Sequence, residues 1–423
     1  MSAIDDDADP GAQTLAFVLA GGRGTRLGAL TANRSKPALP FAGSLRVIDF
    51  ALGNAVNSGL RRVAVLTQYK AQGLIRHLMH GVVASGRGHG TAVDIVPAQQ
   101  QTGEGWYRGT ADAVHQNLEL VRESGARQVL VLAGDHVYKM DYRRMLADHR
   151  RSGAAVSVAC IDVPRSSACA FGVMAAGPDG RVTSFAEKPA SPPPPTGRDD
   201  RVLVSMGIYV FDVPALVAAL CEDAADPASG HDFGHNLIPR LVRRSHVHAH
   251  RFAASGVGPA GAPPYWRDIG TIDAYWAAHM DLLGEAPPLD LNDGSWPILG
   301  VAQAGPAARF EGVSGSVTDS LVGAGCVVSG AALQRAVLGP GVQIRPGCRV
   351  EESVLLPGVR LGRNVVLRRV VVDEGCELPD GIRIGLHPDE DRARFHVTEQ
   401  GVTLVTAEKL APRPFPAREA TMV

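Results

Sequence analysis

The stretch LAFVLAGGRGTRLGALTANRSKPALPF, from Leu15 to Phe41, places a glycine-rich and cationic loop directly after a short apolar strand. Ligands of an α/β sheet bind at the carboxyl ends of its strands, so the loop from Gly21 to Leu27 is predicted to lie at a ligand site. Its glycines let backbone N–H groups approach phosphate oxygens, and Arg23, Arg26 and Lys36 add positive charge. The loop has neither the P-loop pattern nor the GxGxxG dinucleotide fingerprint, and a tight strand-to-helix turn is the alternative. The clustered cations favour phosphate binding.

The composition limits the class of protein. A chain of 423 residues is too long for one ordinary hydrophobic core, which predicts two or more domains. A formal net charge of −1 lacks the basic balance of a nucleic-acid-binding protein. No apolar run reaches the length of a membrane span, and the acidic start MSAIDDDADP is unlike a secretory signal. The six cysteines form no CxxC pair, which favours reduced thiols over structural zinc or a disulfide framework. We therefore expect a cytoplasmic protein that binds neither nucleic acid nor membrane.

The first two thirds of the chain have the pattern of an α/β domain. Short apolar strands alternate with amphipathic helices, which predicts a mostly parallel sheet covered on both faces. From about residue 155 several strands follow one another, so the sheet gains a mixed, antiparallel portion. The proline tract 191–197 is expected to be a surface loop, after a disordered tail at 1–13 and within a domain spanning 14–295. The expected strands are 17–20, 63–67, 93–97 and 129–133, and the expected helices are 48–58, 70–80, 111–124, 213–220 and 276–283.

The last third of the chain, 296–423, contains a repeat of 17 residues. Aliphatic side chains recur about every six residues and point inward, and glycine or asparagine stands where a tight turn needs positive φ. This predicts a parallel β-helix of hexapeptide repeats, because the strands of a β-sandwich do not hold five positions in one register. The positions in register are Leu338, Leu355 and Val372; Ile344, Leu361 and Leu378; Val350, Leu367 and Ile384; Gly341, Gly358 and Gly375; and Gly347, Asn364 and Gly381.

Seven motifs in order carry a family resemblance. They are LAGGRGTRL with SKPALPF, WYRGTADAV (106–114), LAGDHVYKMDY (132–142), AFGVM (170–174), FAEKP (185–189), SMGIYVF (205–211) and YWRDIGT (265–271). They resemble the sugar-nucleotide pyrophosphorylases, which are nucleotidyltransferases that activate sugar 1-phosphates. With the β-helix, they are similar to the branch that serves bacterial glycogen synthesis.

The resemblance implies a fold and a reaction. The fold is a Rossmann-like mixed, mostly parallel sheet followed by a left-handed parallel β-helix. The substrates are ATP and glucose 1-phosphate, the products are ADP-glucose and pyrophosphate, the cofactor is Mg²⁺, and the assembly is a homotetramer. A sugar phosphate oxygen attacks the α-phosphorus of ATP, so the site must position two anionic substrates and screen their charge.

The resemblance also assigns catalytic and metal-binding residues. Asp135 and Asp268 would converge on Mg²⁺, although a single aspartate after a strand is more often a helix cap or a turn residue. Arg26 would hold the β- and γ-phosphates through the two parallel hydrogen bonds of its guanidinium. Lys36 would act on the same phosphates, and a solvated surface lysine is the alternative.

Two substrate-binding sets follow from the same motifs. Glu187 would accept hydrogen bonds from glucose hydroxyls and Lys188 would pair with the sugar phosphate. Because adjacent strand residues point to opposite faces, this requires a twist or bulge next to Pro189. Gln99 or Gln100 would read the adenine edge, since an amide both donates and accepts. The sugar set is Tyr107, Gly172, Glu187, Lys188 and Ser205, and the nucleotide set is Leu19, Gly21, Gly22, Gly24, Thr25, Arg26, Gln99, Gly109 and Thr110.

Three other functions are alternatives to this reaction. The same fold could use UTP, dTTP or GTP, or another sugar 1-phosphate. A noncatalytic regulatory subunit would have lost Asp135, Arg26 or Lys188, and all three are present. An acyltransferase in the β-helix would need a histidine at a coil interface, and 320–384 contains none.

Regulation is where the sequence departs from its relatives. Enteric members of the family bind a sugar bisphosphate through basic residues whose equivalents here are Asn33, Pro40, Ala407 and Ala411. Arg34, Arg46 and Arg369 remain as candidate allosteric residues. We therefore expect weak activation by fructose 1,6-bisphosphate and a response to a smaller phosphorylated metabolite. The alternative is that these arginines only brace the interface between the domains.

Overall fold

A computed structural model of the chain describes residues 9–82, 90–99, 105–193, 200–259, 261–301, 305–312 and 315–410. Residues 1–8 of the predicted tail, part of the proline tract, Gln100 and Ala411 lie outside these ranges. Residues 9–13 form a turn in which Gly11 is buried, and a Cβ there would lie 2.2 Å from the carbonyl oxygen of Gly59. Residues 10–13 therefore pack against the first domain, where a disordered tail was expected.

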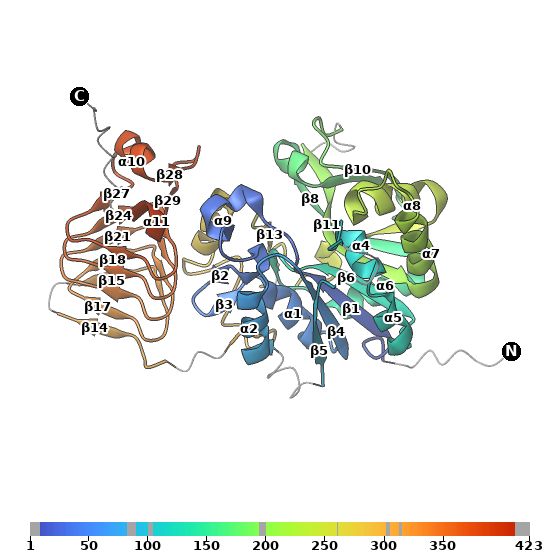
Figure 1. The fold of residues 1–423 in the computed structure, drawn as a ribbon, viewed down its shortest axis with the longest axis horizontal. Coiled ribbons are helices and arrows are strands. Elements are labelled where there is room, and N and C mark those ends of the chain that lie inside the picture. The colour runs from blue at the N-terminus through green and yellow to red at the C-terminus, as the bar shows by residue number, and fades with distance from the viewer. Residues whose placement is uncertain are drawn as a thin grey trace, which may run out of the picture.

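The first domain is built on one mixed sheet (Figure 1). Its parallel half follows the order β6-β1-β4-β5, and β11 runs antiparallel to β6 and opens the second half. The expected change from a parallel to a mixed sheet is thereby confirmed. The strands are β1 (Thr14–Leu19), β4 (Arg62–Thr67), β5 (Ala92–Pro97), β6 (Gln128–Ala133), β8 (Val156–Pro164), β9 (Gly172–Ala176), β10 (Val182–Glu187), β11 (Arg201–Asp212) and β12 (Val247–Arg251).

Helices cover both faces of this sheet, as the sequence predicts. Leu15 and Phe17 of β1 face a core shared with α4, α5, α7 and α8, whereas Ala16 and Val18 face a core shared with α1, α2 and α6. This alternation is the two-residue period of a strand that is buried on both sides. The helices are α1 (Ile48–Asn57), α2 (Gln72–His80), α4 (Thr110–His115), α5 (Leu118–Ser124), α6 (Tyr142–Ser152), α7 (Val213–Ala224) and α8 (Ile238–Arg244).

Two helices differ from the prediction in their start or continuity, and α7 runs four residues beyond its expected end at 220. The helix expected at 111–124 is two helices, α4 and α5, because the side chain of Asn117 donates to the carbonyl of Ala113 and competes with the helical hydrogen bonds. The helix expected at 276–283 is α9 (Ile272–Met280), which begins four residues earlier. Thr271 fixes that start because its side chain accepts a hydrogen bond from the backbone N–H of Ala274.

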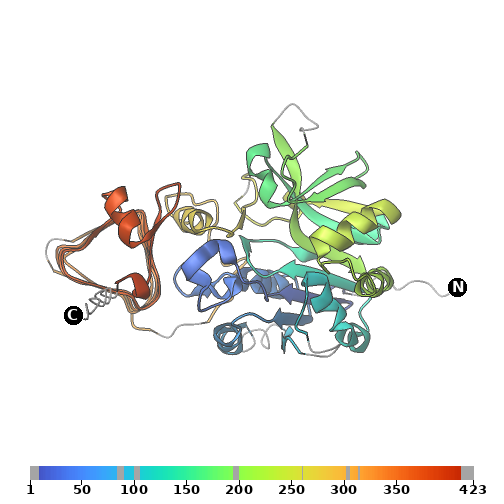
Figure 2. The same cartoon turned by 45° about the horizontal axis from the view of Figure 1, so that its top comes forward.

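The second domain is the expected left-handed parallel β-helix, with a triangular section (Figure 2). The 17-residue register is confirmed, since Leu338 pairs with Leu355, Ile344 with Leu361, and Val350 with Leu367. Asn364 has a φ of +56° at one corner, where Gly347 and Gly381 stand in the neighbouring coils. The strands of its three sides are β14 (Arg309–Glu311), β17 (Val327–Ser329), β20 (Gln343–Ile344), β23 (Arg360–Leu361) and β26 (Glu377–Leu378); β15 (Ser316–Thr318), β18 (Ala332–Gln334), β21 (Arg349–Glu351), β24 (Val366–Arg368) and β27 (Arg383–Ile384); and β16 (Leu321–Val322), β19 (Val337–Leu338), β22 (Val354–Leu355), β25 (Val370–Val372), β29 (Thr403–Val405) and β28 (His396–Val397).

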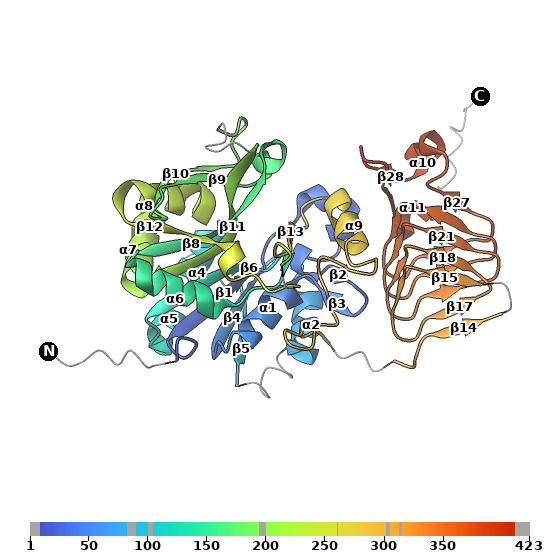
Figure 3. The ribbon, with the colours of Figure 1, turned by 180° about the vertical axis from the view of Figure 1, so that it is seen from behind.

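The two domains share an apolar interface. Val337, Val354 and Val371 of the β-helix belong to the same buried cluster as Tyr275 of α9, and Figure 3 shows α9 facing the β-helix. Residues beyond the predicted boundary at 295 still contact the first domain, because the indole N–H of Trp296 donates to Asn54 Oδ1 at 2.9 Å. Across the ranges that the structure describes, no helix is long and apolar enough to cross a membrane.

Candidate active site

Two adjoining cavities lie at the carboxyl ends of β1 and β6, where the glycine-rich loop was expected to bind a ligand. Their volumes are about 410 Å³ and 220 Å³. Both are lined by Leu19 and Ala133, the last residues of the two strands. They share Leu19, Arg26, Lys36, Thr110, Ala133, Asp135 and Asp232 as a common wall. A ligand in one cavity therefore meets a ligand in the other at this wall.

The larger cavity contains most of the predicted nucleotide set. Gly21, Gly22, Gly24, Gly109 and Thr110 line it. Gly24 has a φ of +65°, and a Cβ there would lie 2.9 Å from Cβ of Lys36, so this turn requires glycine. Among the described residues of the set, Thr25 and Gln99 line neither cavity, since Thr25 begins the 3₁₀ turn Thr25–Thr31 and Gln99 is exposed after β5.

The smaller cavity contains the predicted sugar set apart from Tyr107. Gly172, Glu187, Lys188 and Ser205 line it, whereas Tyr107 lines the larger cavity. The phenol oxygen of Tyr107 accepts a hydrogen bond from Asn117 at 2.9 Å, which holds the ring beside α4. The structure thus places Tyr107 with the nucleotide residues, three positions before the start of α4.

The expected irregularity beside Pro189 is present. Strand β10 ends at Glu187, and Lys188 has a φ of +43°, so the two side chains reach the same cavity instead of opposite faces. Lys188 Nζ donates to Glu187 Oε1 at 2.7 Å. A Cβ at Gly172 or Gly234 would lie 2.7 Å or 2.6 Å from Glu187 Oε2, so two glycines leave room for this carboxylate.

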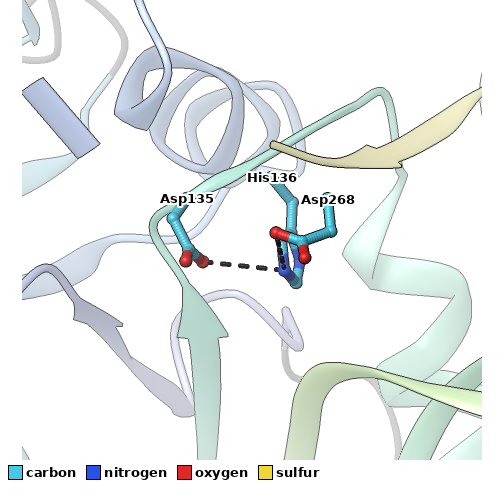
Figure 4. A group of neighbouring side chains, drawn as sticks. All are labelled: Asp135, His136 and Asp268. Atoms are coloured by element: carbon cyan, nitrogen blue, oxygen red, sulfur yellow. Dashed lines mark ion pairs between the residues drawn. The ribbon is translucent and has the colours of Figure 1, made fainter. Parts of the chain in front are cut away.

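An acidic centre lies at the shared wall. Asp268 reaches it because β13 (Trp266–Asp268) pairs with β7 (His136–Tyr138), which sets Asp268 opposite His136. Figure 4 shows His136 Nε2 between the two carboxylates, 3.6 Å from Asp135 Oδ1 and 3.8 Å from Asp268 Oδ1. His136 was missing from the sequence-based site, although it directly follows Asp135 in the GDH motif.

Lys36 joins the two aspartates. Its Nζ lies 2.9 Å from Asp135 Oδ2 and 2.6 Å from Asp268 Oδ1, and the residue is 6% exposed. The alternative of a solvated surface lysine is therefore wrong. Burial lowers the pKa of Lys36, but the two carboxylates outweigh it and raise the pKa above its usual value. For Asp135 the signs are reversed. Burial alone would raise the pKa of this carboxyl, but the charges of Lys36 and His136 outweigh burial and hold the pKa well below its usual value. Both groups stay charged at neutral pH.

The acidic centre fits a divalent cation. Ligand atoms of Asp135, His136 and Asp268 all lie within 4.8 Å of one another. The two carboxylates supply the oxygen ligands that Mg²⁺ prefers. Their convergence on the Lys36 ammonium shows that the centre already accommodates a positive charge between them.

The candidate allosteric arginines lie at the interface between the domains. Arg34 is 2.9 Å from Asp373 and 3.2 Å from Glu374, and Arg46 is 3.6 Å from Glu374. These two acids directly follow β25. Arg369 precedes β25, stacks on the ring of Trp276 at 4.4 Å and lies 3.8 Å from Glu352. Arg34 and Arg46 therefore both contact Glu374, whereas Arg369 lies at the other end of β25.

Asp232 is a further residue that the sequence analysis missed. It lines both cavities and follows a loop after α7, with no strand directly before it. Its position depends on a contact with Thr110 from 122 residues earlier, which no local pattern predicts.

The comparisons with known proteins agree with this geometry. The nucleotidyl transferase family matches residues 15–285, and the GlmU-like C-terminal hexapeptide family matches residues 306–405. Glucose-1-phosphate adenylyltransferase of Nitrosospira multiformis is 50% identical over 404 residues, which cover 95% of each chain. The enzyme of the same name from Albidiferax ferrireducens is 51% identical over 407 residues, covering 95% of this chain and 96% of the relative. That of Bradyrhizobium diazoefficiens is 50% identical over 400 residues, covering 93% and 95%.

Proposed function

This chain belongs to the glucose-1-phosphate adenylyltransferase family of nucleotidyl transferases, and we propose that it converts ATP and α-D-glucose 1-phosphate into ADP-glucose and pyrophosphate. The observation that carries the proposal is the wall common to the two cavities, which contains Arg26, Lys36 and Asp135. The triphosphate in the larger cavity and the sugar phosphate in the smaller one meet there. The reaction would be the first committed step of bacterial glycogen synthesis in the cytoplasm.

The position of each residue in the two cavities indicates its role in the reaction. The sugar phosphate is already an anion, so an in-line attack on the α-phosphorus needs no general base. Lys188 at the smaller cavity would pair with the sugar phosphate, and Glu187 would accept from the glucose hydroxyls. Arg26, whose side chain is 54% exposed and 3.9 Å from Asp268, is free to turn toward the β- and γ-phosphates. Mg²⁺ held by Asp135 and Asp268 would neutralise phosphate charge when bound. Lys36 holds the two carboxylates in place.

The nucleotide is the first test of this proposal. With Mg²⁺ and glucose 1-phosphate, ATP should release pyrophosphate at least about tenfold faster than UTP, dTTP or GTP, the discrimination that a polar base-binding site provides. Pyrophosphate release is measured for each nucleotide at equal concentration, with galactose 1-phosphate as the matched sugar control. Equal rates with all four nucleotides would contradict the adenylyl assignment and leave a nucleotidyltransferase of broader specificity. No release with any nucleotide would favour the noncatalytic subunit.

We further infer a homotetramer. The first coil of the β-helix leaves its apolar end uncovered in the single chain, because Phe310 of β14 is 54% exposed and Val317 of β15 is 43% exposed. Exposed strand edges of this kind are usually covered in a native assembly. Light scattering at micromolar concentration should give four times the mass of the chain. A monodisperse monomer would contradict the assembly.

We also infer that phosphorylated effectors bind at the arginine pair of the domain interface. Arg34 already has two acidic partners and a side chain only 14% exposed, so an effector must displace Asp373 or Glu374. The basic residues of the enteric relatives are replaced here. The loss of two charge-assisted hydrogen bonds, of roughly 1.5–3 kcal/mol each, would lower the affinity for a sugar bisphosphate about a hundredfold or more.

The effector prediction is tested by titrating glycolytic phosphates and AMP against the forward reaction. Fructose 1,6-bisphosphate should activate weakly, and a smaller phosphorylated metabolite should change the rate. Arg46→Ala should abolish that response, whereas Arg360→Ala, an exposed arginine elsewhere on the β-helix, should preserve it. Strong activation by the bisphosphate would contradict the prediction, and no response to any effector would leave the arginines as braces of the interface.

A further inference from the structure

A buried hydrogen bond between an aspartate and a histidine lies behind the wall that the two cavities share. Asp223, in the last turn of α7, is 2% exposed, and its Oδ2 accepts a hydrogen bond of 2.8 Å from Nδ1 of His231. Ser229 Oγ donates to the other carboxylate oxygen at 2.6 Å. A carboxylate in the last turn of a helix faces the negative end of the helix dipole, so this position is unfavourable without such partners. The pair thus needs an explanation beyond the packing of α7.

The backbone of His231 has an unusual conformation next to this contact, and its N–H donates to Ser229 Oγ at 3.0 Å. Its φ is +53°, in the left-handed region that histidine adopts only occasionally. The carbonyl of His231 accepts hydrogen bonds from the N–H groups of Ala111 at 2.8 Å and Asp112 at 3.4 Å, in the first turn of α4. A Cβ at Gly109 would lie 2.2 Å from the same carbonyl oxygen. The residue therefore rests directly against the start of the helix that lines the larger cavity.

The residue after His231 connects this contact to both cavities. Asp232 Oδ2 accepts from Thr110 Oγ1 at 2.9 Å, and the backbone N–H of Phe233 donates to the same Oγ1 at 3.0 Å. Asp232 Oδ1 accepts from the N–H of His235 at 2.9 Å, which fixes the turn that carries Gly234 beside Glu187. Thr110 and Asp232 line both cavities, and Phe233 and Gly234 line the smaller one.

We propose that Asp223 and His231 are positioning residues whose buried contact sets the shared wall for both substrates at once. The proposal rests on the proposed function, because that function assigns ATP and glucose 1-phosphate to the two cavities. Without the contact, residue 231 is released from its left-handed conformation and its carbonyl is no longer held on α4. Asp232 and Thr110 then lose their fixed geometry, and both cavities lose the same wall.

Two substitutions at one position separate the contact from the backbone conformation. Glycine and asparagine both adopt a φ of +53° readily, but only asparagine carries an amide N–H near the position of Nδ1 that can donate to Asp223. His231→Gly should raise the KM values for ATP and glucose 1-phosphate together, each about tenfold, with a change in kcat below about threefold. His231→Asn should recover most of both losses. Cys221→Ala, on the exposed face of the same helix turn, is the matched control.

The outcomes distinguish this proposal from the proposed function. If the wild-type protein forms no ADP-glucose, the proposed function fails. If it does, and His231→Gly changes neither KM or only one of them, the shared positioning role is refuted. A lower melting temperature with both KM values unchanged would show a structural role only and refute it as well. If His231→Gly does not fold, Asp223→Asn replaces it, since this variant keeps the shape of the side chain and should raise both KM values.

Discussion

Replacing Asp135 by asparagine should lower kcat about a thousandfold, the upper range for losing one preorganised electrostatic group at a reacting centre. The carboxylate lies on the wall common to both cavities and accepts from Lys36 at 2.9 Å. Asparagine keeps the shape of the side chain and removes the negative charge that a divalent cation needs. The KM for glucose 1-phosphate should change by less than about threefold, since the sugar set is not altered.

The measurement is steady-state kinetics together with Mn²⁺ binding followed by electron spin resonance, which does not depend on turnover. Mn²⁺ affinity should fall in the Asp135→Asn variant. Asp389→Asn is the control, because the Asp389 side chain is fully exposed on the distant helix α10 (Pro388–Arg394). An Asp135→Asn variant with nearly wild-type kcat would contradict the proposed metal site.

Replacing Lys188 by alanine should raise the KM for glucose 1-phosphate by about ten- to a hundredfold, which corresponds to one charge-assisted hydrogen bond of roughly 1.5–3 kcal/mol. The kcat should change less, because the ammonium holds the sugar phosphate equally in the ground state and the transition state. The backbone effect is small: lysine and alanine both carry a Cβ, so the φ of +43° strains them equally.

Lys70→Ala is the matched control for this variant. Lys70 has a φ of +44°, is exposed and lines neither cavity, so its substitution tests the left-handed backbone without the site. Its KM for glucose 1-phosphate should remain that of the wild type. A Lys188→Ala variant that loses kcat and keeps its KM would contradict the assignment of the smaller cavity to the sugar phosphate.

The sequence predicted the parts of the fold that depend on local periodicity. Leu338 and Leu355, which are 17 residues apart, pair in neighbouring strands of the structure, because each coil repeats the same inward-facing positions. The split of the predicted helix 111–124 was missed, because it depends on a side-chain bond from Asn117 that propensity does not encode. Tyr107 was assigned to the sugar by the family resemblance, whereas in the structure it accepts a hydrogen bond from that same asparagine and lines the larger cavity.

The candidate site was predictable where a residue directly follows a strand and not where two distant segments meet. Asp135 follows β6, and its location follows from the topology alone. Asp268 needed the resemblance, because the pairing of β13 with β7 that brings it beside Asp135 joins segments more than 120 residues apart. The burial of Lys36 was also unforeseen, because it results from two carboxylates that only the folded chain assembles.

In the proposed reaction, an oxygen of glucose 1-phosphate attacks the α-phosphorus of ATP at the wall that the two cavities share. The most direct measurement uses glucose 1-phosphate with ¹⁸O in its phosphate group, unlabelled ATP and the wild-type protein, with the products followed by ³¹P nuclear magnetic resonance. We expect ADP-glucose that carries the label in the phosphate next to glucose and in the bridge between the two phosphates, with unlabelled pyrophosphate. Label in pyrophosphate, or no ADP-glucose at all, would contradict it.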